Sequence, residues 1–335
     1  MDLDQKLIDA ARNCDLARVK RIVAQGADPA SQNNMAIIAA ASRGCIDVIN
    51  YLITLPGVDP AAQNNEAIIA ASEYSLSTVQ YLVMLPGVDP AAQNNQPIIS
   101  AAISGRLDIV KYLTTLPRVN PAAQNNAVII KASKYGQLEV VRYLVTLPGV
   151  DPAARNNQAI ISAATHAQLD IVKYLATLPG VNPAAQTNRA IIGAAMNGSL
   201  DIVQFLATLP GVDPAAPNNE AIIGAAKYGH LNVVQYLASL QGFNLRGSYD
   251  DLLIWAVSKG LIIIIELLIE RFKLDITANE NHALLVAAGS GNMEMVTYLV
   301  NLKGVDPHVD GDLPAYYAEK NNHPEVADFL RNYRK

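Results

Sequence analysis

Apolar residues along the chain form two short alternating blocks, and both blocks recur about every 31 residues. The first block, for example residues 67–71, is a run of alanine and isoleucine. The second block, for example residues 231–237, places its apolar residues at helical spacing and leaves a polar face. The pattern therefore predicts a short, small-residue first helix followed by an amphipathic second helix in each repeat.

A turn of constant composition separates the repeats. It opens at Gly26, Gly57, Gly87, Arg118, Gly149, Gly180 and Gly211, with weaker copies at Gly242, Lys273 and Gly304. The spacing is 31 residues except between Gly57 and Gly87, where it is 30. Self-similarity at this period indicates a stacked repeat protein, in which each repeat contacts only its neighbours.

Asparagine or aspartate precedes the first block in ten copies, and we expect its side chain to cap the first helix. These residues are Asn34, Asn65, Asn95, Asn126, Asn157, Asn188, Asn219, Asp250, Asn281 and Asp312. Glycines such as Gly229 end the first helix. Acidic residues such as Asp201 stand in the first turn of the second helix, where the helix dipole favours negative charge.

The order of helix, glycine turn, longer helix and Gly-Val-Asp loop resembles the ankyrin repeat. Residues 198–206 match that family's Gly-His-Leu-Glu-Val-Val-x-Leu-Leu second helix, whereas residues 66–69 replace its Thr-Pro-Leu-His. The resemblance covers residues 3–333. The loop is shorter than in the usual ankyrin repeat, so we expect a tight turn in place of a projecting β-hairpin.

The resemblance implies an all-α solenoid of stacked helix–turn–helix pairs, curved and elongated, over residues 1–335. We expect an N-terminal capping pair in residues 1–25, nine internal units in residues 26–303 and a C-terminal capping unit in residues 304–335. Eleven helix pairs follow from this division.

Residue type varies between repeats at the two positions before the turn glycine, while the remainder is nearly constant. The resemblance implies that these positions line a concave surface that binds another protein, and tyrosine and arginine are common interface hot spots. The expected contacts are Arg43, Tyr74, Lys134, Tyr135, His166, Met196, Lys227 and Tyr228, with the only tryptophan, Trp255, as an anchor. Sequence drift at exposed positions is the alternative explanation.

Two repeats depart from the pattern. The shortened repeat has Tyr74 and Ser75 in place of the turn glycine, and the loop of residues 242–248 has lost its Asp-Pro. In that second repeat Leu261 and Ile263 stand where other repeats carry polar residues. They predict a contact patch on the outer face. The alternative is that Trp255 fills space left by sequence drift and that Leu261 and Ile263 are singly exposed apolar residues.

No catalytic, phosphate-binding or metal-binding motif is present in the sequence. The histidines lie scattered among the repeats without metal-ligand spacing; they are His166, His230, His282, His308 and His323. We therefore expect no enzyme activity, no cofactor and no metal. An interaction arm of a larger enzyme is the alternative.

Charge and composition exclude several classes of binding partner. The net charge of −5, without a lysine or arginine block, argues against nucleic acid and anionic membranes as partners. The longest apolar run, residues 261–269, is too short for membrane insertion, and the polar N-terminus is no secretory signal. Cys14 and Cys45 stand in adjacent repeats at slightly different repeat positions, which predicts no disulfide and favours a reducing compartment.

The sequence thus predicts a cytoplasmic, monomeric, non-catalytic scaffold that binds a partner protein through its concave face. Self-association into a dimer through the outer face near Leu261 and Ile263 is the alternative. Similar arrays occur in intracellular bacteria, large viruses and protists, so the resemblance also implies an effector acting in the cytoplasm of a host cell.

Overall fold

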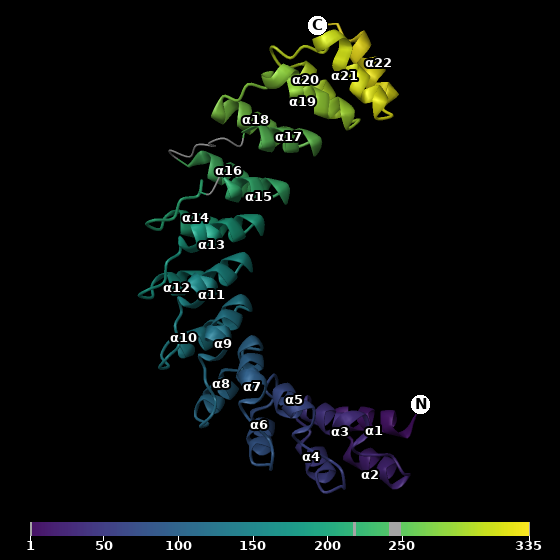
Figure 1. Cartoon of the computed structure of the whole chain (residues 1–335), viewed down its shortest axis with the longest axis vertical. Coiled ribbons are helices and arrows are strands. Elements are labelled where there is room, and N and C mark those ends of the chain that lie inside the picture. Colours follow the sequence, from purple (N-terminus) through teal and green to yellow (C-terminus); the bar gives the residue numbers. More distant parts are fainter. Residues whose placement is uncertain (1, 217–218, 241–248, 335) are drawn as a thin grey trace. The chain divides into compact units, whose positions relative to one another are not determined.

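The computed structural model of the chain describes residues 2–216, 219–240 and 249–334. Over these ranges 22 helices follow one another without a strand, and they form eleven helix–turn–helix pairs (Figure 1). The all-α prediction, the eleven pairs and the absence of a β-hairpin in the described loops are confirmed. The loop of residues 242–248, where the Asp-Pro is lost, lies outside the described residues.

The first compact unit is Met1–Asn182, in which the first helices lie side by side in chain order (Figure 1). These are α1 (Leu3–Arg12), α3 (Ser31–Ala41), α5 (Ala62–Ala71), α7 (Ala92–Ile103), α9 (Ala123–Lys134) and α11 (Ala154–Thr165). Each packs on its own second helix; these are α2 (Leu16–Ala24), α4 (Ile46–Leu52), α6 (Leu76–Val83), α8 (Leu107–Thr114), α10 (Leu138–Leu144) and α12 (Leu169–Ala176).

The second compact unit is Pro183–Lys335. Its first helices are α13 (Ala185–Met196), α15 (Glu220–Lys227), α17 (Tyr249–Ser258), α19 (Ala278–Gly289) and α21 (Val309–Lys320). Its second helices are α14 (Leu200–Ala207), α16 (Leu231–Ser239), α18 (Ile262–Phe272), α20 (Met293–Val300) and α22 (Pro324–Asn332).

Within each unit the core consists of thin layers between neighbouring helix pairs. Ile37, Ile68 and Ile98 occupy the same position in successive first helices, and each is fully buried. Complete burial of such a side chain contributes about 1.5–3 kcal/mol. Alanines beside them, such as Ala40 and Ala71, are also buried and let neighbouring helices approach closely.

A left-handed turn precedes the right-handed part of most first helices. In α5 the φ angles of Gln63, Asn64 and Asn65 are 54°, 56° and 71°. A left-handed conformation costs roughly 1–2 kcal/mol per residue for most side chains, and asparagine tolerates it better than most. The repeated Gln-Asn-Asn sequence therefore specifies a local reversal of helical hand. The same turn opens α3, α7, α9, α11, α13 and α21.

The last asparagine of this turn binds the next repeat rather than its own helix. The Oδ1 atom of Asn34 accepts the N–H of Asp59 at 2.8 Å, and Asn126 accepts that of Asp151 at 2.8 Å. The same bond joins Asn65 to Asp89, Asn95 to Asn120, Asn157 to Asn182, Asn188 to Asp213 and Asn281 to Asp306. The capping prediction was wrong for these residues, because the acceptor oxygen bonds a loop N–H of the following repeat.

Three further hydrogen bonds, made by two side chains, complete the loop. The carboxylate of Asp59 accepts the N–H of Ala61 at 2.8 Å, which closes the turn around the intervening proline. The Nε2 atom of Gln63 donates to the carbonyl oxygens of Gln32 and Asn33, at 3.3 and 3.0 Å. This loop thus donates to the preceding repeat from two groups, the backbone N–H of Asp59 and the side-chain amide of Gln63.

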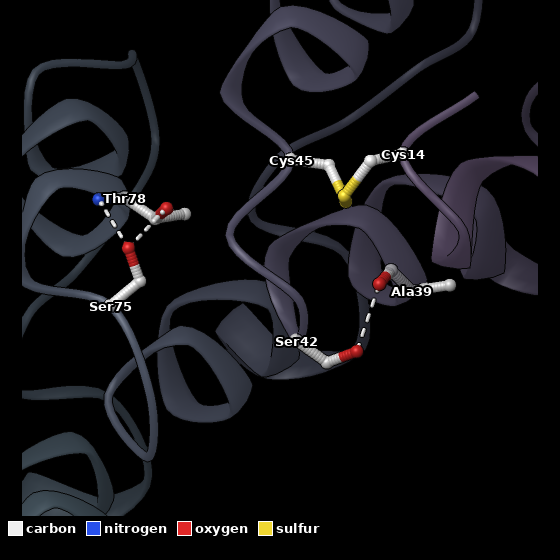
Figure 2. The surroundings of a disulfide bond; sticks show 6 residues. All are labelled: Cys14, Ala39, Ser42, Cys45, Ser75 and Thr78. Atoms are coloured by element: carbon white, nitrogen blue, oxygen red, sulfur yellow. Dashed lines mark hydrogen bonds between the residues drawn. A yellow bond between two sulfur atoms is a disulfide. The ribbon is translucent and has the colours of Figure 1, made fainter. Parts of the chain in front are cut away.

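In several pairs of each unit, the turn faces the start of the second helix in the next pair. A Cβ atom on Gly44 would stand only 3.2 Å from the Cβ atom of Ser75, which caps α6 (Figure 2). One pair earlier, Cys14 takes the place of Gly44 and Cys45 takes the place of Ser75. They form a disulfide with a Cα–Cα distance of 5.1 Å (Figure 2).

The prediction of unpaired cysteines was therefore wrong. Their offset by one repeat position makes them direct neighbours, because the turn of one repeat lies against the helix start of the next. The disulfide joins residues 31 positions apart. Closing a loop of that length stabilises the folded state by roughly 3–4 kcal/mol in the chain-entropy model.

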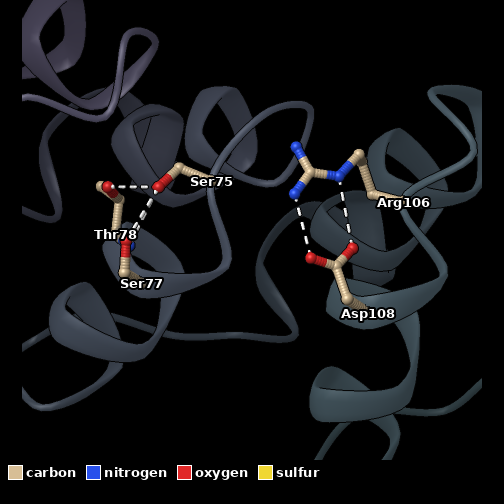
Figure 3. A network of polar contacts seen from close by, with 5 residues as sticks. All are labelled: Ser75, Ser77, Thr78, Arg106 and Asp108. Atoms are coloured by element: carbon tan, nitrogen blue, oxygen red, sulfur yellow. Dashed lines mark hydrogen bonds and ion pairs between the residues drawn. The ribbon is translucent and has the colours of Figure 1, made fainter.

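The helix-start position that holds Cys45 carries a different interaction in later pairs. Arg106 donates from Nε and Nη2 to Asp108 at 3.2 and 2.9 Å (Figure 3). These bonds hold the pKa of the Asp108 carboxyl below its ordinary value. Gln137 donates from Nε2 to the carbonyl of Ile103 at 3.0 Å. Asp108 also stands in the first turn of α8, as the sequence predicted.

The asparagine bond between repeats can be tested with Asn95→Ala and the matched control Asn94→Ala. Both residues have left-handed backbones, so both substitutions carry the same conformational cost. Only Asn95 is buried and accepts the N–H of Asn120, at 2.6 Å. We expect Asn95→Ala to lower the free energy of unfolding by about 1–3 kcal/mol more than the control. Urea denaturation followed by circular dichroism measures this, and equal losses would contradict the assigned role.

Candidate partner-binding surface

The first helices end in a short exposed segment just before the turn glycine. After α9, Gly136 has a φ of 79°, and the N–H of Gln137 bonds the carbonyl of Ala132, five residues back, at 2.9 Å. This left-handed C-terminal turn satisfies a helix-end carbonyl. In the first unit the residue directly before the glycine is exposed, as at Arg43, Ser104 and Tyr135, so its side chain can differ between repeats.

In the first unit, the residues predicted to contact a partner lie in this segment. Tyr74 and Tyr135 are 56% and 46% exposed, and Arg43 and His166 are exposed as well. Lys134 is half-buried, with its Nζ atom 5.4 Å from the centroid of the Tyr135 ring. Arg43, Tyr74, Tyr135 and His166 therefore lie at equivalent positions along one edge of the unit, and Lys134 lies one residue before that position.

Tyr74 reaches this edge through a shortened turn. The N–H of Ser75 bonds the carbonyl of Ala71, four residues back, at 3.0 Å. The turn contains no residue with positive φ. The single missing residue thus replaces the usual glycine turn by a tighter one, and Tyr74 directly precedes Ser75, the N-cap residue of α6.

In the second unit, the predicted contacts separate into exposed and packed residues. Tyr228 is 62% exposed, and Lys227 is exposed beside it. Met196 is half-buried and lies against α15, where its Cγ atom is 2.5 Å from the position of a Cβ on Gly224. Trp255 is half-buried within α17. Gly224 and Trp255 stand at the same repeat position, so a large ring replaces a hydrogen atom there.

The two residues predicted for the outer face also differ from each other in exposure. Leu261 is the half-buried N-cap residue of α18, and Ile263 is 51% exposed. Together with Leu231, Ile262 and Glu294 they line a hollow of about 250 Å³.

Two exposed aromatic residues were missed by the sequence analysis. Tyr316 and Tyr317 on α21 are 54% and 40% exposed. Tyr317 lies two repeat periods after Trp255, so comparison of repeat positions would have found it.

A model of ankyrin repeats (three copies) matches residues 7–94, 67–156, 98–187, 129–218, 191–280 and 253–335. The chain belongs to the ankyrin-repeat family. Ankyrin repeats are generally scaffolds for protein–protein interaction and are typically not catalytic. No curated protein matches this ankyrin-repeat chain.

The described part of the ankyrin array holds no group of three or more histidine, cysteine, aspartate or glutamate residues that could bind a metal ion. No helix in that part combines the length and apolar character that a membrane crossing needs.

A larger hollow, of about 570 Å³, lies at the C-terminal end of the second unit between residues 303–308 and 333–334. His308 closes one side: Nδ1 lies 2.6 Å from a carboxylate oxygen of Asp312, and Nε2 lies 3.0 Å from the carbonyl oxygen of Tyr333. Both partners only accept hydrogen bonds, so only the protonated imidazole satisfies both. The bond to Asp312, followed by that to Tyr333, raises the pKa of His308.

Attachment of α22 should therefore depend on pH. The folded pKa of His308 is raised, so its contribution is complete below the unfolded value of about 6.5 and is lost as pH rises through the folded pKa. We expect amide hydrogen exchange in α22, corrected for its intrinsic pH dependence, to become faster across this range. His308→Gln should remove the pH dependence, and a step that persists in this variant would contradict the assignment to His308.

Proposed function

We propose that this ankyrin-repeat chain is a non-catalytic scaffold that binds another protein through the concave face formed by its first helices. One observation carries the proposal: tyrosine is exposed at the same edge position in three repeats. Tyr74, Tyr135 and Tyr228 are between 46% and 62% exposed. A tyrosine ring offers a large apolar area together with a hydroxyl, and its burial by a partner stabilises a complex.

The backbone beneath these side chains supports this function. The turn after α9 is held by the hydrogen bond from Gln137 to Ala132, and Gln137 also bonds Ile103 of the preceding repeat. A surface fixed in this way loses little backbone entropy on binding. We propose that Arg43, Lys134 and His166 add polar contacts along the same edge.

The arrangement of the two units and the place of action are further parts of the proposal. We propose that both units belong to one continuous array, capped by residues 1–25 and 304–335. We also propose that the protein acts as an effector in the cytoplasm of a host cell. Disulfides persist mainly in oxidising surroundings, so the bond between Cys14 and Cys45 favours a period outside reducing cytoplasm.

Self-association is the second candidate function, favoured by the exposed Ile263 beside the hollow near Leu261. One exposed isoleucine offers a smaller apolar area than a stable interface needs. We therefore expect multi-angle light scattering to give a monomer mass at every concentration, for both the natural chain and Ile263→Asp. A mass that rises with concentration and falls back in Ile263→Asp would instead support self-association.

Protein capture tests the proposed surface. We expect the triple variant Tyr74→Ala, Tyr135→Ala and Tyr228→Ala to retain less than roughly a tenth of the proteins that the natural chain captures from cell lysate, because truncated hot spots commonly cost tenfold or more each. The exposed tyrosines make few internal contacts, so the melting temperature should stay nearly unchanged. Quantitative mass spectrometry and thermal denaturation measure the two effects.

Met84→Ala is the matched control for this experiment. Met84 is 73% exposed but follows the second helix α6, away from the tyrosine positions. Capture should be unchanged in this variant. If the triple variant captures as much as the control, the proposed surface is wrong.

A further inference from the structure

Two columns of side chains cross the first helices at the end of the second unit. Trp255, Val286 and Tyr317 share one repeat position, and Ile254, Leu285 and Tyr316 share the position before it. The helices that carry them, α17, α19 and α21, pack side by side in this order. We call these six residues the aromatic patch.

The aromatic patch exposes positions that the first unit, apart from the exposed Lys131 at the Trp255 position, buries or fills with small residues. The equivalents of Ile254 in the first unit include Ile38 and Ile99, which are 7% and 4% exposed, and one equivalent of Trp255 is Ala39, at 3%. In the patch the half-buried side chains are those of Ile254, Trp255, Leu285 and Val286. Tyr316 and Tyr317 are largely exposed, with their rings in an edge-to-face arrangement at 6.0 Å.

Aromatic residues that are partly exposed suit an interface. Each ring is partly held by its neighbours, so it loses little side-chain entropy when a partner covers the remainder. Tryptophan and tyrosine are also the commonest interface anchors. The aliphatic side chains between them, Leu285 and Val286, extend an apolar surface for aliphatic or aromatic side chains of a partner.

Positive charge borders the aromatic patch at the C-terminal ends of its helices. Lys259 and Lys320 are exposed, and the Nζ atom of Lys320 lies 6.0 Å from the centroid of the Tyr316 ring. Glu319, next to Lys320, is ion-paired with Arg331 of α22. The lysines therefore offer charge to a bound ligand, whereas this neighbouring carboxylate is already engaged.

We propose that the aromatic patch binds an acidic peptide segment with interspersed aromatic or aliphatic side chains. This inference rests on the proposed protein-binding function and assigns the chemistry of the partner. Apolar side chains of the peptide cover Trp255, Val286 and Tyr317, and its carboxylates face Lys259 and Lys320. A single-stranded nucleic acid fits less well, because it needs a basic groove along its backbone, and this patch is bordered by two lysines beside aliphatic residues.

The patch contains its own spectroscopic reporter, because Trp255 is the only tryptophan in the chain. The full chain is titrated with a short synthetic peptide that alternates glutamate with leucine and phenylalanine. The two comparison probes are the same peptide with lysine in place of glutamate, and oligothymidylate. Of the three probes, we expect only the acidic peptide to shift Trp255 emission to shorter wavelength, in a saturable way. We expect added salt to weaken the binding of this peptide.

Three variants locate the interaction. Tyr317→Ala keeps the reporter and should weaken acidic-peptide binding roughly tenfold, as for a hot-spot residue. Lys259→Glu with Lys320→Glu should reverse the preference toward the lysine peptide. Tyr135→Ala, in the first unit, is the control and should leave the titration unchanged.

The inference is overturned if the acidic peptide leaves Trp255 emission unchanged, or if the lysine peptide or oligothymidylate binds equally well. These results are separable from the proposed function. Loss of protein capture in the tyrosine triple variant together with a silent Trp255 would overturn only the partner chemistry. Unchanged capture together with a saturable Trp255 shift would overturn the tyrosine surface and leave the aromatic patch as a binding site.

Discussion

The hydrogen bond from an asparagine side chain to a loop N–H of the next repeat is the interaction on which the stack depends. Asn34, Asn126 and Asn157 are each at least nine-tenths buried. A buried N–H left without an acceptor destabilises a fold by about 1–3 kcal/mol. The loop of each repeat is therefore complete only when the preceding repeat is folded. The first repeat uses a substitute, since Asp4 accepts the N–H of Asp28 at 2.8 Å.

This dependence explains why an unfavourable backbone recurs. The left-handed residues before each first helix cost conformational energy, but they place Asn65 against the loop of the next repeat and Gln63 against carbonyls of the preceding one. The cost arises once in each repeat and is offset by bonds on both sides. Stability in such a stack depends on contacts between neighbours, so side chains outside these contacts can differ between repeats.

The variable residues are accordingly found where neighbouring repeats do not constrain them. The edge before the turn glycine carries exposed Tyr135 and Tyr228, whereas Met196 at the same edge packs across Gly224. The helix-start position is constrained in space but not in chemistry, since it holds a disulfide at Cys45 and an ion-paired side chain at Arg106. One backbone geometry thus supports both a constant scaffold and a surface of changing composition.

The sequence by itself determined the repeat period, the eleven helix pairs and the exposed edge before the turn. These follow from periodic apolar residues and turn glycines, which act within a few residues of each other. Only the tertiary structure decided the partners of Asn34 and Cys14, the packing of Met196 and the exposure of Tyr317. Each of these depends on which side chain of the adjacent repeat stands opposite. The residues that face each other in this way are 25 to 31 positions apart in the sequence. At that separation, helical periodicity and turn composition do not indicate which side chains are in contact.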